Sequence, residues 1–159
     1  MYVKVKKLHP QAILPQRQTT GSSGFDLHVL DAVTWDCARA PYDDHFTSIT
    51  ICPGDRILVR TGIALQLELG MEGQVRPRSG LALRHGITLL NTPGTIDADY
   101  RGDIGLILIN LGQQPVEIGK GERVGQLVIQ PVWHQLQLVE IEELELTQRG
   151  TGGFGHTGV

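Results

Sequence analysis

The sequence has little of what a disulfide-stapled, membrane-bound or nucleic-acid-coating protein needs. It holds only two cysteines, Cys37 and Cys52, too few for a disulfide framework and too sparse for a zinc site. They could pair, but free thiols are the simpler expectation. No stretch approaches the ~18 consecutive apolar residues of a membrane span. The net charge of −3 argues against a surface built to coat nucleic acid. We expect a cytoplasmic protein with neither a nucleic-acid nor a membrane partner.

Familiar catalytic signatures are also missing. The six histidines show no metal-ligand spacing, and no serine or cysteine lies in a recognisable nucleophile signature. Segment 149–158 contains a formal G-x-G-x-x-G match, but a dinucleotide site needs a strand before it and a long helix after it. We therefore reject a dinucleotide site. Without a covalent nucleophile or a metal held by the protein, attack by an activated water is the chemistry we expect.

Glycine, by contrast, is abundant, and its positions indicate a β protein. The 20 glycines stand between short apolar runs, as in strands joined by tight turns. Apolar residues alternate with polar or small ones over 57–59 and 63–69, which predicts one apolar face. The run 104–109 is apolar without a break and predicts a strand buried on both faces, and 124–129 and 136–141 continue the series. We expect one all-β domain, a jelly-roll-type barrel or sandwich.

Three segments depart from this pattern. We expect one short helix, with Ser79 as its cap, helix formers at 81–84 and Gly86 closing it. Residues 35–48 mix acidic residues, proline and histidine with little periodicity, which predicts a loop. Residues 149–159 are rich in glycine and should be mobile unless something holds them down.

One segment, 76–81, carries groups suited to a phosphorylated ligand. Arg78, Ser79 and Gly80 stand where the helix should begin. Unpaired N–H groups at a helix start favour an anion, and an arginine adds charge-assisted hydrogen bonds to phosphate oxygens. The alternative is a surface arginine beside an ordinary serine cap.

A second segment, 91–102, could bind the rest of a nucleotide. A hairpin with Asn91 and Asp97 at its two sides could present polar groups to a flat ligand edge. Asp97 could accept a proton from water, and Tyr100 could pack against a sugar ring. Asp97 could equally be a turn former, which is the interpretation we prefer for Asp99.

Two further segments carry single groups of interest. Gln126 lies among apolar neighbours, where a buried amide must find a partner, either a phosphate or a neighbouring carbonyl. The glycine-rich arm offers Arg149, Phe154 and many backbone amides, so it could fold over a phosphorylated ligand with Phe154 stacked on a base. A disordered tail is the alternative.

Five motifs in order resemble the trimeric deoxyuridine triphosphatase family. They run from Gly24 toward the C-terminus, so the resemblance covers nearly the whole chain. The motifs are GFDL at 24–27, PRSGLA at 77–82, GTIDADYRG at 94–102, RVGQL at 123–127 and RGTGGFG at 149–155.

The resemblance implies both fold and activity. It implies a homotrimer of distorted jelly-roll-like (β-clip) barrels, each with one short helix, and active sites shared between subunits. Residues 1–148 would form the β domain, with a loop insertion at about 35–48, and 149–159 an arm that closes over the site. The implied reaction is hydrolysis of dUTP to dUMP and pyrophosphate, which limits uracil in DNA and supplies dUMP for thymidylate synthesis.

The resemblance also implies roles for single residues. Asp97 would be the general base, and Asp26 would bind, through water, a magnesium ion otherwise held by the triphosphate. Asn91 and the backbone near Ile96 and Gly105 would read the uracil edge, and Tyr100 would exclude a ribose 2′-hydroxyl. The full substrate-binding set would be Arg78, Ser79, Gly80, Asn91, Thr95, Ile96, Asp97, Tyr100, Gly105, Gln126, Arg149, Phe154, Gly155 and Thr157.

Some residues depart from the family pattern, and two rival functions stay open. Gly125 stands where the family usually has alanine, and the 35–48 loop is longer than usual. A deoxycytidine triphosphate deaminase of the same superfamily would be expected to use a glutamate where this chain has Asp97. A nucleotide-sensing regulatory protein could use the same pocket without hydrolysis.

Overall fold

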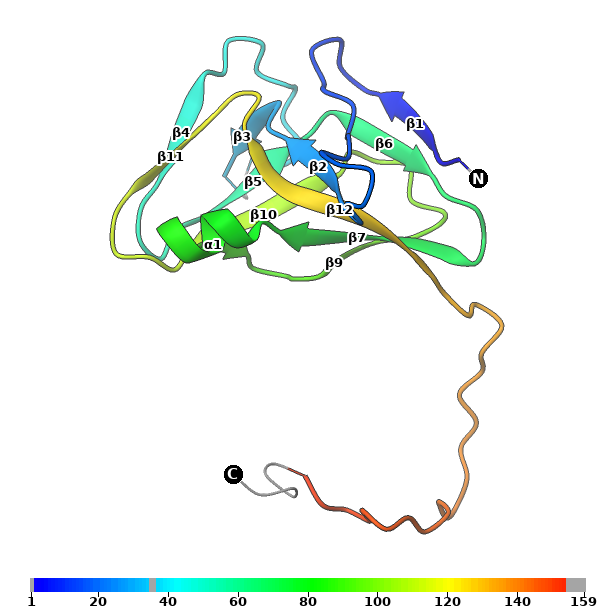
Figure 1. Ribbon diagram of the computed structural model, residues 1–159. Helices are drawn as coiled ribbons and strands as arrows, with labels where there is room; N and C mark the ends of the chain where they lie inside the picture. The colour runs from blue at the N-terminus through cyan, green and yellow to red at the C-terminus, as the bar shows by residue number, and fades with distance from the viewer. Residues whose placement is uncertain (1, 35–36, 154–159) are drawn as a thin grey trace.

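The chain folds into antiparallel sheets around one core, with a long C-terminal segment that leaves the body (Figure 1). The computed structural model describes residues 2–34 and 37–153. Its elements are β1 (Lys4–Lys7), β2 (Phe25–His28), β3 (Asp31–Val33), β4 (Ser48–Ile51), β5 (Arg56–Arg60), β6 (Ile63–Gln66), β7 (Met71–Pro77), α1 (Ser79–His85), β8 (Ile87–Leu89), β9 (Gly94–Ile96), β10 (Gly105–Asn110), β11 (Val116–Gly119) and β12 (Arg123–Pro131).

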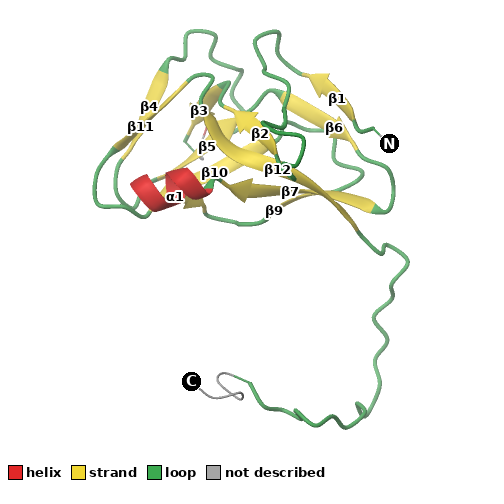
Figure 2. Ribbon diagram, in the orientation of Figure 1, coloured by secondary structure: helices red, strands yellow, loops and turns green. Residues whose placement is uncertain are grey.

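Two four-stranded sheets form most of the body. One has the strand order β3-β5-β10-β8 and the other β2-β12-β7-β9, while β1-β6 and β11-β4 form two-stranded ribbons. Strands, yellow in Figure 2, account for nearly all the regular structure. A single core cluster draws buried residues from both large sheets, among them Val59 and Leu108 from one and Val75 and Leu127 from the other. The all-β prediction is confirmed.

The alternation of apolar residues correctly predicted β5 and β6. Ile57, Val59, Ile63 and Leu65 are all buried. The pattern misled at its end, because β6 stops at Gln66 and Leu69 lies in the following turn with 82% of its surface exposed.

Strand β10 is fully buried on one face only. Leu106, Leu108 and Asn110 have no exposed surface, whereas Ile107 and Ile109 on the opposite face are half-buried. The expectation of burial on both faces therefore fails within one chain. Asn110 is tolerated in the core because its amide donates to the carbonyls of Ile51 and Gln114 and its side-chain oxygen accepts from the Gly112 amide.

The predicted strand at 136–141 does not form in the single chain. After β12 the described residues hold no helix or strand, and the segment extends away from the sheets (Figure 1). Its apolar side chains stay largely exposed, and no strand of the described residues pairs with this backbone. The exposed apolar residues are Trp133, Leu136, Leu138, Val139, Ile141, Leu144 and Leu146.

The short helix is confirmed, although its cap lies one residue earlier than expected. Arg78 is the N-cap residue, with extended backbone and no capping hydrogen bond from its side chain, and Ser79 is the first helical residue. Gly86 closes the helix in the left-handed conformation at φ 71°, and its amide donates to the Ala82 carbonyl. No described helix is long and apolar enough to cross a bilayer.

Both cysteines are free, as expected, and both are exposed. Of the predicted 35–48 loop, residues 37–47 form a loop, Ser48 already begins β4, and 35–36 lie outside the described residues. A buried ion pair beneath the loop anchors it. Arg60 donates to the Asp31 carboxylate through Nε (2.7 Å) and through its terminal nitrogen, and the same guanidinium donates to the carbonyls of Ala40 and Pro41. Removing one partner of such a pair costs about 3–5 kcal/mol, because the other charge stays buried.

Gly125 is required by close packing between the two large sheets. It lies in β12 at a register irregularity, and a Cβ there would overlap Leu106 Cδ2 of β10 and approach the Arg76 carbonyl to 3.3 Å. Leu106 thus fills the space that a methyl group at position 125 would occupy.

We predict that Gly125→Ala destabilises the fold by about 1–3 kcal/mol through overpacking, because neither neighbour can retreat freely. Urea denaturation followed by circular dichroism measures this change. Adding Leu106→Val to the Gly125→Ala chain should recover part of the loss, because the shorter side chain vacates the contested space. If the two substitutions simply add, the close contact does not determine the choice of glycine.

Candidate functional site

A charged cluster lies where β2, β7 and β12 meet. Asp26, with 13% of its side chain exposed, accepts a hydrogen bond from Arg123 at 3.0 Å, and Arg78 Nε lies 4.0 Å from its other oxygen. Arg78 also donates to the Arg123 carbonyl at 2.7 Å. Two arginines and one carboxylate leave the cluster with one positive charge, which suits an anionic ligand.

Gln126 completes this cluster. It pairs with Asp26 across β2 and with Arg76 across β7, and its amide donates to the Pro77 carbonyl at 3.0 Å. The sequence left a phosphate or a neighbouring carbonyl open as the partner of this amide, and in the structure the partner is a carbonyl. Gly24 makes room for the side chain, because a Cβ at position 24 would overlap the Gln126 amide oxygen.

His28 adds an electrostatic constraint beside the cluster. Its Nδ1 is buried and has no hydrogen-bond partner among the described residues. Burial lowers the pKa of His28, and the positive charges of Arg123 and Arg78 lower it further, against the opposing effect of Asp26. These effects together favour the neutral imidazole.

The second group of predicted residues lies on the connection between β8 and β10. These two strands pair antiparallel, so 91–104 is the excursion between them. It is not a tight hairpin, because β9 in its middle joins β7 of the other sheet. Thr95 and Asp97 are exposed, Ile96 is buried and Asn91 lies against Gly94. Gly105 begins β10 opposite Arg60.

Tyr100 projects from this excursion and is partly ordered by it. Its amide donates to the Asp97 carbonyl at 3.1 Å, and its hydroxyl donates to the Asp103 carbonyl at 3.0 Å. The residue keeps 43% of its surface exposed. A half-exposed aromatic ring fixed at its hydroxyl end can support an apolar ligand face.

The two groups are too far apart in one chain to contact the same phosphorus atom. Asp97 follows Ile96, which pairs with Gly73 near the start of β7, whereas Arg78 follows the end of β7. At ~3.3 Å per residue, Gly73 to Arg78 spans roughly 16 Å of strand. Asp26 also lies on β2, at the opposite edge of the sheet from β9.

Arg149, the predicted arm residue that the structure describes, lies on the segment that leaves the body (Figure 1). Arg149 is exposed, and its Nε donates to the Gly152 carbonyl at 2.8 Å, within a local turn. The other predicted arm residues, Phe154, Gly155 and Thr157, lie outside the described residues. The structure therefore brings together Asp26, Arg78 and Gln126 but not the complete predicted set.

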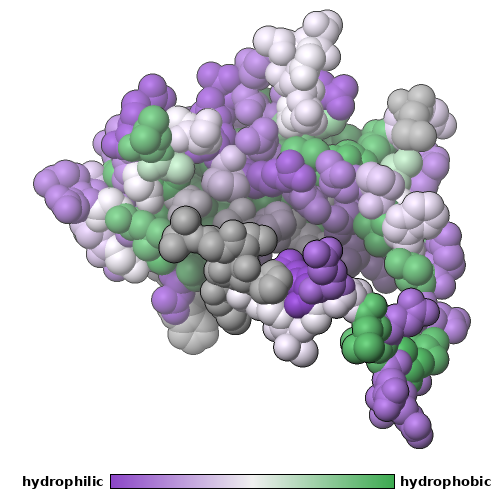
Figure 3. Space-filling view, turned by 60° about the horizontal axis from the view of Figure 1, so that its bottom comes forward, coloured by the Kyte–Doolittle hydropathy of each residue, from purple (hydrophilic) through white to green (hydrophobic). Residues whose placement is uncertain are grey.

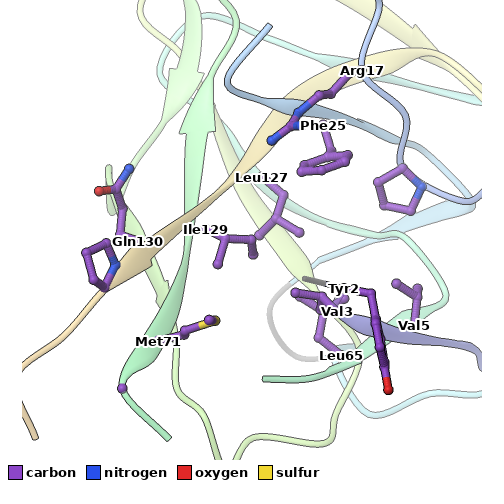
Figure 4. A pocket seen from close by; sticks show the side chains of 13 residues that line it. Tyr2, Val3, Val5, Arg17, Phe25, Leu65, Met71, Leu127, Ile129 and Gln130 are labelled. Atoms are coloured by element: carbon purple, nitrogen blue, oxygen red, sulfur yellow. The ribbon is translucent and has the colours of Figure 1, made fainter. Parts of the chain in front are cut away.

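A separate hollow in the described part of the chain lies elsewhere. It is an apolar cavity of about 660 Å³ between the N-terminal strand and the ends of β7 and β12 (Figure 4). Arg17 covers the Phe25 ring on one wall, 4.4 Å from its centroid. None of the predicted site residues that the structure describes lines it. Its lining residues are Tyr2, Val3, Val5, Pro15, Arg17, Phe25, Leu65, Gly70, Met71, Leu127, Ile129, Gln130 and Pro131.

Comparison with known proteins decides the family. The dUTPase family model matches residues 10–158. The chain belongs to the dUTPase family. A deoxyuridine 5'-triphosphate nucleotidohydrolase of Heliobacterium modesticaldum is 67% identical over 159 residues, covering 100% of this chain and 98% of that protein. The corresponding protein of Nautilia profundicola is 49% identical and covers 99% of both. The predicted family is thereby confirmed.

Solved dUTPase structures share the fold. The dUTPase of Staphylococcus bacteriophage 80alpha, solved with dUPNHPP, aligns with a TM-score of 0.83 at 24% identity and covers 99% of both chains. A mutant of the dUTPase from phage phi11 of S. aureus, described with a structural Mg(II) ion, aligns with a TM-score of 0.75 at 20% identity, covering 92% of this chain and 100% of that one. The jelly-roll-like architecture is confirmed.

Sequence reasoning overlooked two residues of interest. Arg123 was part of a quoted motif, but its ion pair with Asp26, 97 residues earlier, has no local signal. Asp103, which ends the long connection, was also passed over, although an acidic residue directly before an apolar strand can indicate a buried carboxylate.

Proposed function

We propose that this dUTPase hydrolyses dUTP to dUMP and pyrophosphate by attack of an activated water on the α-phosphorus. Membership of the family and the nucleotidohydrolase relatives that match end to end support this activity. The reaction would limit uracil in DNA and supply dUMP for thymidylate synthesis. The observation that supports this proposal most is the separation of Asp97 from Arg78 on one sheet. One substrate would contact both groups only if they came from different subunits.

The active site would therefore be shared within a homotrimer. Asp97 and the phosphate-binding Arg78 stand at opposite ends of β7, roughly 16 Å apart along the strand. Both must approach the α-phosphate if one activates the water and the other holds the charge. Neighbouring subunits would supply the missing half of each site, as in other interface sites built by closed symmetry.

Asp97 would act as the general base. It follows β9 directly, so the sheet fixes its backbone while its side chain stays exposed to water and substrate. A positioned carboxylate can orient a water and accept its proton as the water attacks the α-phosphorus. The bond to the pyrophosphate oxygen then breaks.

Arg78 and Gln126 would hold the phosphates, together with Ser79 and the Gly80 amide. The cluster's excess positive charge favours the triphosphate. In the free chain both side chains already donate to carbonyl oxygens, Arg78 to that of Arg123 and Gln126 to that of Pro77. Binding would replace these carbonyl oxygens with phosphate oxygens.

Magnesium fits this cluster as an ion carried by the substrate. Among the described residues, no three His, Cys, Asp or Glu side chains gather into a metal-binding group. Asp26 offers one carboxylate, the hard oxygen donor that magnesium prefers, and would act through a bound water. The ion would offset charge that develops on the leaving pyrophosphate.

Base and sugar would bind along the β8–β10 connection. Asn91 and the backbone at Ile96 and Gly105 would read the uracil edge, with Thr95 beside them. Tyr100 would pack on the deoxyribose. The arm would close the site, bringing Phe154 to the base, and Arg149, Gly155 and Thr157 to the nucleotide.

The segment between β12 and the arm supports assembly. Its apolar residues are exposed, and Leu136 and Leu138 alternate with glutamines as in a strand with one apolar face. Figure 3 shows apolar and polar side chains mingled on the projecting chain. Such residues find burial on a neighbouring subunit rather than in water.

Asp97→Asn tests the base. We expect the variant to keep its fold and bind a non-hydrolysable dUTP analogue, but to lose turnover by ~10²-fold or more, because the amide cannot accept the proton. Purified protein is incubated with magnesium and dUTP, dCTP, dTTP or UTP, and the products are identified. Near-normal turnover would remove Asp97 from this role. Ammonia released from dCTP by the wild-type protein would instead support a deaminase, and binding without reaction a sensor.

Gly24→Ala tests the phosphate cluster. The added methyl group would overlap the Gln126 amide oxygen, so we expect KM for dUTP to rise several-fold while the melting temperature stays within a few degrees. Gly21→Ala is the matched control, because nothing lies near a Cβ at position 21. Equal KM values in both variants would exclude Gln126 from phosphate binding.

Paired substitutions test assembly. Leu136→Asp with Leu138→Asp places two charges on the apolar face and should weaken the trimer, since burying an unpaired carboxylate is costly. Gln135→Asp with Gln137→Asp adds the same charge to the opposite face and should leave the trimer intact. Sedimentation velocity reports the distribution of species. Trimers of equal stability in both pairs would show that the segment is not an assembly element.

A further inference from the structure

The Asp103 side chain joins three segments that are distant in sequence. Its Oδ2 accepts a hydrogen bond from the Tyr42 hydroxyl at 3.2 Å. Its Oδ1 accepts from the Ile63 amide at 3.2 Å and lies 3.1 Å from the Thr61 hydroxyl. The carboxylate is thus fixed from the 37–47 loop, from the turn after β5 and from the start of β6.

The same residue holds the Tyr100 ring from the other side. The Tyr100 hydroxyl donates to the Asp103 backbone carbonyl, and the ring lies directly on Gly102, where a Cβ would overlap it. Gly102 and Asp103 therefore determine where the Tyr100 ring points. Any movement of the Asp103 backbone carries the hydroxyl end of Tyr100 with it.

Tyr42 is itself well anchored. The loop carbonyls of Ala40 and Pro41 accept from Arg60, and the Asp43 amide donates to Asp31 at 2.9 Å. The Arg60 guanidinium also lies over the Tyr42 ring, 4.7 Å from its centroid. The buried ion pair therefore holds the loop, and the loop presents the Tyr42 hydroxyl to Asp103.

We propose that Tyr42 and Asp103 are positioning residues that hold Tyr100 against the sugar and thereby set the discrimination between dUTP and UTP. This role rests on the proposed function of Tyr100. It gives the described 37–47 part of the loop, whose role the sequence left open, a task in substrate selection.

The physical basis is the sensitivity of steric selection to small displacements. A ring that leaves no room for a 2′-hydroxyl discriminates between dUTP and UTP only while it cannot move away from the sugar. A shift of the ring by about 1 Å is enough to admit the extra oxygen atom or to misorient the substrate. The hydroxyl of Tyr42 is a dependable donor, because burial and the charge of Asp103 raise its pKa to about 12. Burial raises the pKa of Asp103, while its hydrogen bonds from Thr61 and Tyr42 lower it.

Tyr42→Phe tests the proposal, because it removes one hydroxyl and keeps the ring over Arg60. The ratio of kcat/KM for dUTP to that for UTP is measured in wild type and variant. We expect the ratio to fall about threefold to tenfold, the size of one lost hydrogen bond, mainly through faster use of UTP. An unchanged ratio overturns the proposal.

Two comparisons separate positioning from general loosening of the loop. Asp44→Ala removes the 2.9 Å contact with His9 from the same loop but removes no contact of Asp103, so the ratio should stay at the wild-type value. In a Tyr100→Phe background, Tyr42→Phe should change the ratio no further, because both act through one hydroxyl-to-carbonyl contact. An equal fall in Asp44→Ala, or additive effects in the double variant, contradicts a positioning role.

Amide hydrogen exchange keeps this test separate from that of the proposed function. In the free wild-type and Tyr42→Phe proteins, exchange over residues 97–104 reports the ordering of the connection without any substrate. We expect faster exchange there in Tyr42→Phe and no change in Asp44→Ala. Equal exchange in wild type and Tyr42→Phe overturns the proposal. If the wild-type protein fails to hydrolyse dUTP, the proposed function falls, while the exchange result still decides whether Tyr42 orders the connection.

Discussion

The structure depends on strand β12 being paired along both edges. Its register places Gln126 opposite Asp26 on β2 and Arg76 on β7 at once, and Arg123 at its start reaches the Asp26 carboxylate. A strand so held can carry charged and amide groups at a defined position, because its own backbone bonds are already satisfied. This arrangement requires a glycine at position 125, because Leu106 of the facing sheet leaves no space for a side chain there.

The same geometry divides the candidate site. Strands β9 and β7 are antiparallel. Asp97, which follows β9, and Arg78, which follows β7, therefore lie at opposite ends of this pair of strands. In the proposed mechanism one protomer would hold either the water or the phosphates of one substrate, but not both. Such a chain would complete its site only by association, which would make assembly a requirement of the chemistry rather than an addition to it.

Local patterns predicted the local structure well. Alternation over 57–67 and the position of Gly86 correspond to β5, β6 and the end of α1, because period and backbone conformation are properties of neighbouring residues. Contacts between distant residues, such as Arg123 with Asp26, left no such pattern. The strand expected at 136–141 failed for a related reason. Alternation there indicates a strand, but no strand of the described residues pairs with it.

The Asp31–Arg60 pair shows how a buried ion pair can fix one conformation of a loop without adding much to the stability of the fold. Desolvation offsets much of the attraction in a buried ion pair, so such a pair is weak evidence for stability. The remaining donors of Arg60, however, bind the carbonyls of Ala40 and Pro41, and Asp31 accepts from the Asp43 amide. These hydrogen bonds hold the loop in one arrangement above β3 and β5. Apolar replacements could fill the space but could not choose among arrangements of the loop. A polar anchor beneath a long loop is therefore what a hydroxyl donor such as Tyr42 needs to reach one carboxylate reproducibly.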